Sequence, residues 1–118
     1  MREPPAIDGF GGGGFRVAGV WRPGSLLIVA DEPRNWRPSA LGELTVDDLE
    51  PVFEAAAGAV EFVLLGTGLR QALPAAAVRE AVRRAGLGLE FMATDAAARL
   101  HNVLASEGRL FATALIAI

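Results

Sequence analysis

The last nine residues of the chain, Leu110 to Ile118, are apolar at almost every position. This run is well short of the roughly 20 apolar residues that a transmembrane helix needs. A short continuous apolar run is instead typical of a strand that is covered on both faces, as in the middle of a sheet. We therefore expect the C-terminal segment to lie inside a sheet, so that the chain closes on itself as one globule.

Upstream of this segment, helix and strand signals alternate. Three amphipathic helices are expected to begin near Thr45, Pro74 and Thr94, and each pattern ends at a glycine. Short, mostly apolar strands are expected over residues 60–65 and 87–93. Alternating strands and helices favour parallel crossovers, with the helices packed on the sheet.

The N-terminal third has a different pattern. Residues 15–22 alternate in the way that a strand requires, a Pro-Gly pair follows, and residues 25–30 form a second apolar run. These two runs are expected to pair as an antiparallel β-hairpin. Residues 1–13 are expected to be a flexible or extended lead-in, and residues 31–44 a loop.

The predicted order of elements is β-β-α-β-α-β-α-β, which describes an α/β fold with a mixed sheet. At 118 residues the chain fits a single domain over residues 1–118, with one hydrophobic core. Hydrophobic residues make up 52% of the chain and charged residues 21%, which is the composition of a folded protein rather than a disordered one.

The composition also excludes several classes of function. A formal net charge of -3 argues against a nucleic-acid platform, which needs a concentrated cationic surface. Because the chain has no lysine and no cysteine, it has no Schiff-base, P-loop lysine or thiolate chemistry. The single histidine, His101, cannot supply a zinc site and is expected to be a partly exposed helix residue. We expect no metal and no cofactor, and the sequence favours a protein without catalysis over an enzyme.

Two loops that follow predicted strands are candidates for a ligand-binding site. The carboxyl ends of parallel strands meet at one rim of an α/β sheet, where such folds bind ligands. Glycines there let a ligand approach the backbone, and an arginine can meet an anion. The alternative is a turn that needs a positive φ, beside a solvated arginine. The candidate residues are Gly66, Thr67, Gly68, Arg70, Thr94 and Asp95.

A second set of residues is a candidate interaction surface. Arg16 and Arg22 fall on the less apolar face of the predicted hairpin, so this face is expected to meet solvent or a partner. Trp21 and Trp36 are each either an interface anchor or a side chain packed into the core or a loop, and packing is favoured for both. The candidate interaction surface therefore comprises Arg16, Arg22 and Trp36.

Several short motifs occur together in an order that resembles one known family. They are Gly14-Phe15-Arg16-Val17, Gly24-Ser25-Leu26-Leu27, Trp36, Leu64-Leu65-Gly66-Thr67-Gly68, Thr94-Asp95-Ala96-Ala97, Asn102-Val103-Leu104 and Glu107-Gly108-Arg109. From about Ile7 to Ile118 the chain resembles the family of mitochondrial complex I assembly factor 3 and the adipogenesis-associated domain protein. This resemblance implies a three-layer fold, in which a β-hairpin layer accompanies an α/β unit with a mixed sheet.

The resemblance also implies a function. It points to a non-enzymatic role in protein interaction or assembly, with a subunit or biogenesis factor of a membrane complex as the partner. Residues 1–8 lack the apolar run of a signal peptide, and the import sequence of mitochondrial members is missing, so a bacterial, cytoplasmic protein that does not span a membrane is expected. The alternative is a small-molecule or anion-binding domain, or an enzyme, with a cleft at the loop from Gly66 to Arg70.

Overall fold

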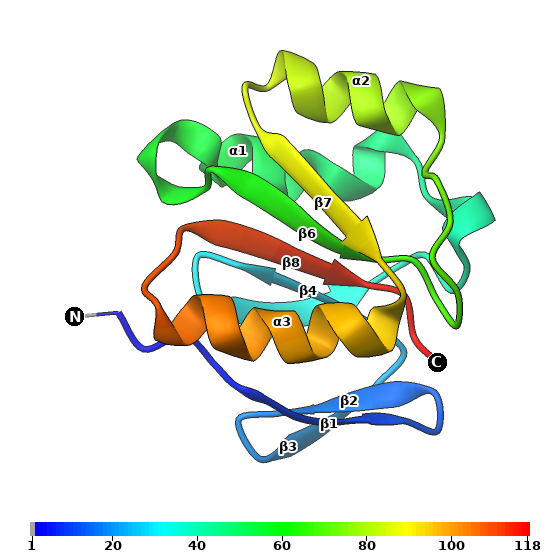
Figure 1. Cartoon of the computed structure of the whole chain (residues 1–118), viewed down its shortest axis with the longest axis vertical. Helices are drawn as coiled ribbons and strands as arrows, with labels where there is room; N and C mark the ends of the chain where they lie inside the picture. Colours follow the sequence, from blue (N-terminus) through cyan, green and yellow to red (C-terminus); the bar gives the residue numbers. More distant parts are fainter. Residues whose placement is uncertain (1) are drawn as a thin grey trace.

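The computed structural model describes residues 2–118, and within them the chain forms eight strands, three α-helices and two short 3-10 helices (Figure 1). The strands are β1 (Ile7–Gly11), β2 (Gly14–Val17), β3 (Val20–Pro23), β4 (Ser25–Val29), β5 (Glu32–Trp36), β6 (Phe62–Gly66), β7 (Gly88–Met92) and β8 (Phe111–Leu115). The α-helices are α1 (Glu50–Ala59), α2 (Ala76–Arg84) and α3 (Thr94–Ser106), and the 3-10 helices cover Leu41–Glu43 and Val46–Leu49.

The strands form two sheets. The small sheet has the order β1-β2-β3, and the large sheet has the order β5-β4-β8-β6-β7. In the large sheet, β8 is antiparallel to β4 and parallel to β6. The C-terminal strand therefore lies in the middle of a mixed sheet, as predicted from its apolar run, although it ends at Leu115.

The large sheet is the middle one of three layers (Figure 1). Helices α1 and α2 cover one face and bury residues such as Val52 and Val78 against Leu27 of β4. Helix α3 and the small sheet together cover the other face, where Phe15 packs with Leu26 of β4. Adjacent residues of one strand thus enter two different cores, which is why the central strands need apolar side chains at consecutive positions. The predicted α/β class, mixed sheet and three layers are confirmed.

The N-terminal hairpin differs from the prediction. The turn that was expected at Pro23-Gly24 lies instead at Ala18 and Gly19, whose φ angles of 49° and 80° match a two-residue type I′ hairpin turn. The alternating run 15–22 is therefore folded in half, and its two parts pair as β2 and β3. Gly24, with φ of 83°, makes the corner through which the chain passes from the small sheet into β4.

Two further strands lie where none was predicted. Within the expected lead-in, Ile7–Gly11 form β1, which is the extended of the two alternatives for these residues. Within the expected loop, Glu32–Trp36 form β5, at an edge of the large sheet. An edge strand tolerates proline and charged side chains. Because Pro33 and Arg34 are more typical of a loop, the sequence pattern did not predict a strand here.

The second half of the chain follows the predicted order α-β-α-β-α-β. The first helical segment begins after Thr45, whose backbone N–H donates to the carboxylate of Asp48 over 2.8 Å. This is the bond by which an acidic side chain reaches back in a capping box, and Asp replaces the usual Glu here. The segment begins as a 3-10 helix and continues as α1.

Candidate functional site

The two candidate ligand-binding loops lie side by side at one rim of the large sheet. The backbone N–H of Thr94 donates to the carbonyl of Gly68 over 2.8 Å, and the Gly68 N–H donates to Thr94 Oγ1 over 2.9 Å. The loop after β6 and the start of α3 are thus joined by a reciprocal pair of hydrogen bonds. The structure brings Gly66, Thr67, Gly68 and Thr94 together.

The polar groups of this rim are bonded to one another. The hydroxyl of Thr94, which is fully buried, also donates to the carbonyl of Ile116 over 2.8 Å. Thr67 Oγ1 lies 2.6 Å from the carbonyl oxygen of Arg70 and accepts from the Ala72 N–H over 3.2 Å. Both threonine hydroxyls therefore hold loops and the C-terminal segment in place.

Gly66 is required by a close approach rather than by an unusual φ. A Cβ atom at this position would lie 2.8 Å from Leu115 Cδ2 and 2.9 Å from Thr94 Oγ1, which is closer than van der Waals contact allows. The missing side chain lets α3 begin directly against the end of β6. This packing fills the place where a ligand would meet the backbone.

The two charged members of the predicted site lie outside this network. Arg70 is exposed. Asp95 lies 3.6 Å from the guanidinium of Arg99, one helical turn further on, and both side chains are about half exposed or more. Such a surface pair contributes little to stability, so Asp95 acts here as an ordinary acidic residue in the first turn of a helix.

The outward surface of the small sheet carries a different arrangement. Arg16 of β2 and Trp21 of β3 are direct cross-strand partners, so their side chains share one face of the sheet. The side of Gly14 that lacks a Cβ faces the Trp21 ring, since a Cβ there would lie 2.7 Å from Trp21 Cζ2. The Trp21 side chain is nevertheless 46% exposed. We call Gly9, Gly14, Arg16 and Trp21 the outer face.

Of the predicted interaction surface, only Arg16 lies on the outer face. Arg22 is the cross-strand partner of Phe15, so it shares the side that packs toward the core and is half-buried. Trp36 is 7% exposed, and its indole N–H donates to the carbonyl of Asp48 over 2.9 Å. Trp36 is therefore a core residue, and Trp21 is the tryptophan that meets solvent. A two-residue turn at 18–19 reverses the face of every residue after it, which the sequence reading missed.

An ion pair between Arg37 and Asp48 lies next to the buried Trp36. The Arg37 guanidinium donates two hydrogen bonds, of 2.8 and 2.7 Å, to the carboxylate of Asp48. With further bonds from Thr45, this arrangement lowers the pKa of Asp48 to about 2. The Asp48 carboxylate thus holds the segment between β5 and α1 together, although 59% of the Arg37 side chain is exposed.

His101 is buried, in contrast to the expectation of a partly exposed helix residue. Its Nε2 lies 2.8 Å from the carbonyl oxygen of Pro5 and its Nδ1 lies 2.7 Å from Thr113 Oγ1. Because a carbonyl can only accept, Nε2 carries the proton, and Nδ1 accepts from the Thr113 hydroxyl. Burial lowers the pKa of His101, which favours this neutral form. The imidazole thus joins α3, β8 and the N-terminal segment.

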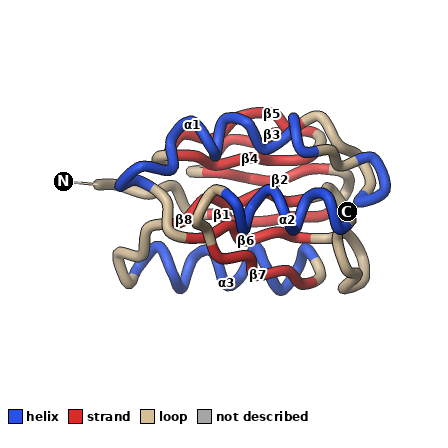
Figure 2. The backbone as a smooth tube through the Cα atoms, turned by 90° about the horizontal axis from the view of Figure 1, so that it is seen from above, coloured by secondary structure: helices blue, strands red, loops and turns tan. Residues whose placement is uncertain are grey.

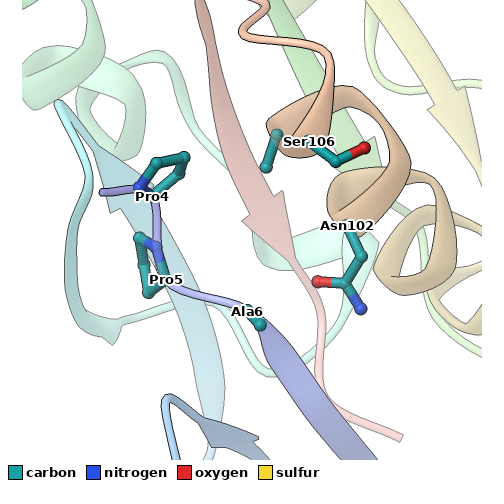
Figure 3. A pocket seen from close by; sticks show the side chains of 6 residues that line it. Pro4, Pro5, Ala6, Asn102 and Ser106 are labelled. Atoms are coloured by element: carbon teal, nitrogen blue, oxygen red, sulfur yellow. The ribbon is translucent and has the colours of Figure 1, made fainter. Parts of the chain in front are cut away.

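A second side chain of α3 fastens the same N-terminal segment. Asn102 accepts from the Ile7 N–H over 2.8 Å and donates to the Ile7 carbonyl over 2.9 Å, in the way that a neighbouring strand would. Beside it lies a hollow of about 270 Å³, in which Pro4 and Pro5 face Asn102 and Ser106 across the gap (Figure 3). The Asn102 amide is already committed to Ile7, so the hollow offers a ligand few free polar groups.

Metal-binding clusters and membrane-spanning helices are both absent from the described part of the chain. Residues 2–118 hold no cluster of three or more side chains of the kinds that bind metals. None of the helices in this range combines the length and the apolar character that crossing a bilayer requires.

Comparison with known proteins identifies relatives over nearly the whole chain. An uncharacterized protein of Rhodobacter capsulatus is 38% identical over 93% of this chain and 82% of its own length. NADH dehydrogenase (ubiquinone) 1 alpha subcomplex assembly factor 3 of Danio rerio is 30% identical over 87% of this chain, but over only 59% of its own length. The chain is thus a distant homologue of this assembly factor and spans less than two thirds of it.

Solved structures share the fold. A structure described as an outer membrane protein from Bartonella henselae is 30% identical, with a TM-score of 0.88, and the match covers 97% of this chain and 95% of that one. The model of one family, described as "Protein of unknown function (DUF498/DUF598)", matches residues 7–116. Together with the assembly-factor homologues, this match confirms the resemblance that was read from the motifs. The chain belongs to the DUF498/DUF598 family.

Proposed function

We propose that this protein is a non-enzymatic interaction protein that helps to assemble a membrane-bound respiratory complex, and that it contacts a subunit or biogenesis factor through the outer face. The observation that carries the proposal is the exposed Trp21 beside Arg16. Tryptophan and arginine are the residue types most enriched among the anchors of protein interfaces. Homology to an assembly factor supports a subunit or biogenesis factor of a respiratory complex as the partner.

The geometry of the outer face supports this role. Gly14 has no side chain and is buried, because the Trp21 ring lies directly against the strand backbone there. The strand thus supports the ring, and the exposed part of Trp21 is free to meet a partner. Arg16 is exposed and adds a cation to a chain of net charge -3, which favours an acidic patch on the partner. An aromatic ring with a neighbouring cation is a compact anchor for such a patch.

The anion-binding alternative has weaker support. At the rim of the large sheet, the hydroxyls of Thr67 and Thr94 bond to backbone groups of the protein itself. Of the candidate residues there, only Arg70 offers an exposed cationic side chain. A single exposed arginine without a shaped cleft binds anions weakly, because the ion pair is screened by solvent.

Affinity capture from the native cell, with quantitative mass spectrometry, tests the proposal. We expect the unmodified chain to recover subunits or biogenesis factors of a respiratory complex, and Trp21→Ser combined with Arg16→Glu to lower their recovery at least about tenfold, as loss of an interface anchor does. Val103→Ser, at an apolar residue of α3 that is 51% exposed, is the control and should retain them. Recovery of no such protein, or equal recovery by the double variant, would contradict the proposal.

A further inference from the structure

The two edges of the large sheet are protected to different degrees. Strands β5 and β7 are the outermost strands, at opposite edges (Figure 2). Proline and charged side chains discourage a further strand from pairing at an edge, and β5 carries both in Glu32, Pro33 and Arg34. Strand β7 has the sequence Gly-Leu-Glu-Phe-Met, with no proline and a single charge at Glu90. Its edge is therefore less protected against pairing than the edge at β5.

The backbone of β7 alternates between its neighbour and the open edge. The Gly88 N–H donates to the Glu61 carbonyl over 3.0 Å, and the Met92 carbonyl accepts from the Thr67 N–H over 2.8 Å, so both face β6. In a parallel ladder alternate residues of a strand face the same neighbour, so Gly88, Glu90 and Met92 face β6 and the residues at odd positions face away from it. The backbone groups of Leu89 and Phe91 therefore point to the open edge, where Gln71 Nε2 bonds the Phe91 carbonyl over 3.2 Å. The N–H and carbonyl of Leu89 and the N–H of Phe91 remain directed outward.

Beside this edge lies a hollow of about 290 Å³, on the side of the sheet that α3 covers. Its lining residues are Phe62, Glu90, Leu100, Leu104 and Arg109. Three of these residues are apolar, and the Arg109 guanidinium lies over the ring of Phe62 at 5.1 Å, so that Phe62 is only 8% exposed. Gly88 has no side chain to cover Phe62, since a Cβ there would lie only 3.2 Å from Phe62 Cβ. An apolar side chain that entered from the edge beside Gly88 would occupy this hollow, next to its apolar lining residues.

Glu90 supplies a charge that has no partner within residues 2–118. Its side chain projects on the same side as the hollow and is exposed. It takes part in no ion pair and no side-chain hydrogen bond of the described chain. A basic side chain on an added strand, opposite Glu90, would form a cross-strand pair of opposite charge.

We propose that the open edge of β7 binds an extended segment of a second protein, which adds a sixth strand to the large sheet. The segment carries a basic residue opposite Glu90 and, two positions away, an apolar residue that enters the hollow beside Gly88. Main-chain bonds to Leu89 and Phe91 supply affinity, and the two alternate side chains supply specificity, as in other complexes that form by strand addition. This site lies on a different layer from the outer face and does not depend on the function proposed above.

A second copy of this chain is a poor occupant of the edge. When two β7 strands pair antiparallel in full overlap, each Leu89 bonds with the Phe91 of the other copy, and the two Glu90 residues stand directly opposite each other. In such a pair the two Cα atoms are about 4.5 Å apart, so the two side chains are direct neighbours. Like charges that stand directly opposite each other destabilise the pairing. The charge on β7 therefore selects a heterologous, basic strand.

Selection of peptides from a displayed random library, with the full chain as bait, tests the proposal. We expect the enriched peptides to alternate apolar and polar residues around a lysine or arginine, and to shift the amide resonances of Leu89 and Phe91. Glu90→Lys should weaken their binding at least about tenfold, because like charges then face each other. Glu32→Lys, the same charge reversal at the β5 edge, is the matched control and should bind as the unmodified chain does.

Three results would overturn the proposal. One is a selection that enriches no alternating basic peptide. Another is a set of enriched peptides that bind Glu90→Lys as tightly as the unmodified chain, or that leave the β7 amides unshifted. The third is sedimentation of the chain as a dimer that becomes a monomer in Leu89→Pro, since a second copy would then occupy the edge.

Discussion

The rim of the large sheet and the outer face of the small sheet are both rich in glycine and polar side chains, but their groups are used in opposite ways. At the rim, Thr94 is fully buried and bonds with Gly68 and Ile116. On the outer face, Arg16 and Trp21 are exposed cross-strand partners, and the Trp21 ring covers the buried Gly14. Polar residues near strand ends are therefore no guide to function until their bonding partners are known. Damage to the rim should cost stability, and damage to the outer face should cost binding.

The largest effect is expected from Gly66→Ala at the rim. The added Cβ would collide with Leu115 and with both the side chain and the backbone of Thr94, so we expect a loss of about 3 kcal/mol of unfolding free energy, at the upper end of the usual cost of overpacking. Urea unfolding followed by circular dichroism measures the change. Gly42→Ala is the control, because no atom lies within 4 Å of a Cβ at that site. Equal stability of the two variants would mean that the rim is not closely packed.

A smaller loss of about 2 kcal/mol is expected for Thr94→Val, which keeps the shape of the side chain but removes its hydroxyl. The Gly68 N–H and the Ile116 carbonyl would then lack the partner that they have now. Thr94→Ser retains the hydroxyl and should recover most of the loss in the same unfolding measurement. A Thr94→Val chain as stable as the unmodified one would show that water replaces these bonds.

Like the rim threonines, His101 bonds only to other groups of the protein, but its contribution to stability depends on pH. Burial lowers its pKa in the folded chain below the unfolded value of 6.5. The unfolded state therefore binds more protons as the pH falls through 6.5, so the contribution of the neutral imidazole is complete above this pH and is lost below it. Unfolding free energies measured between pH 8 and pH 5 should fall in the unmodified chain. His101→Gln should remove this dependence, and a persistent fall in that variant would assign it to other groups.

The smallest effect on stability is expected for Trp21→Ser, at most about 0.5 kcal/mol, because exposed positions seldom contribute more. The same variant should lose its captured partner, which the rim variants that remain folded should keep. Urea unfolding and affinity capture, run on one set of variants, separate the two regions. A loss of stability as large as that of Thr94→Val would mean that Trp21 is a structural residue of the small sheet.

Features of the site that follow from local sequence patterns could be predicted, whereas those that depend on contacts between distant residues could not. The approach of the Gly66 and Thr94 loops follows from parallel strand order, which alternating strand and helix patterns reveal. Whether Thr94 faces a ligand or the Ile116 carbonyl depends on a contact between residues that are 22 positions apart. The choice between Trp21 and Trp36 likewise depended on a turn of two residues, since Ala18 and Gly19 lack the Asn-Gly or Asp-Gly signature of such turns.

The sequence alone determined the alternation of helices and strands after Thr45 and the central position of the C-terminal strand. Both follow from local periodicity and from the need of a strand covered on two faces for continuous apolar side chains. Only the tertiary structure decided that the first third forms five strands in two sheets, that Trp36 and His101 are buried, and that the β7 edge remains open. These features depend on pairing between distant segments, and edge strands and short hairpins leave little trace in the hydrophobic pattern because few of their positions are buried.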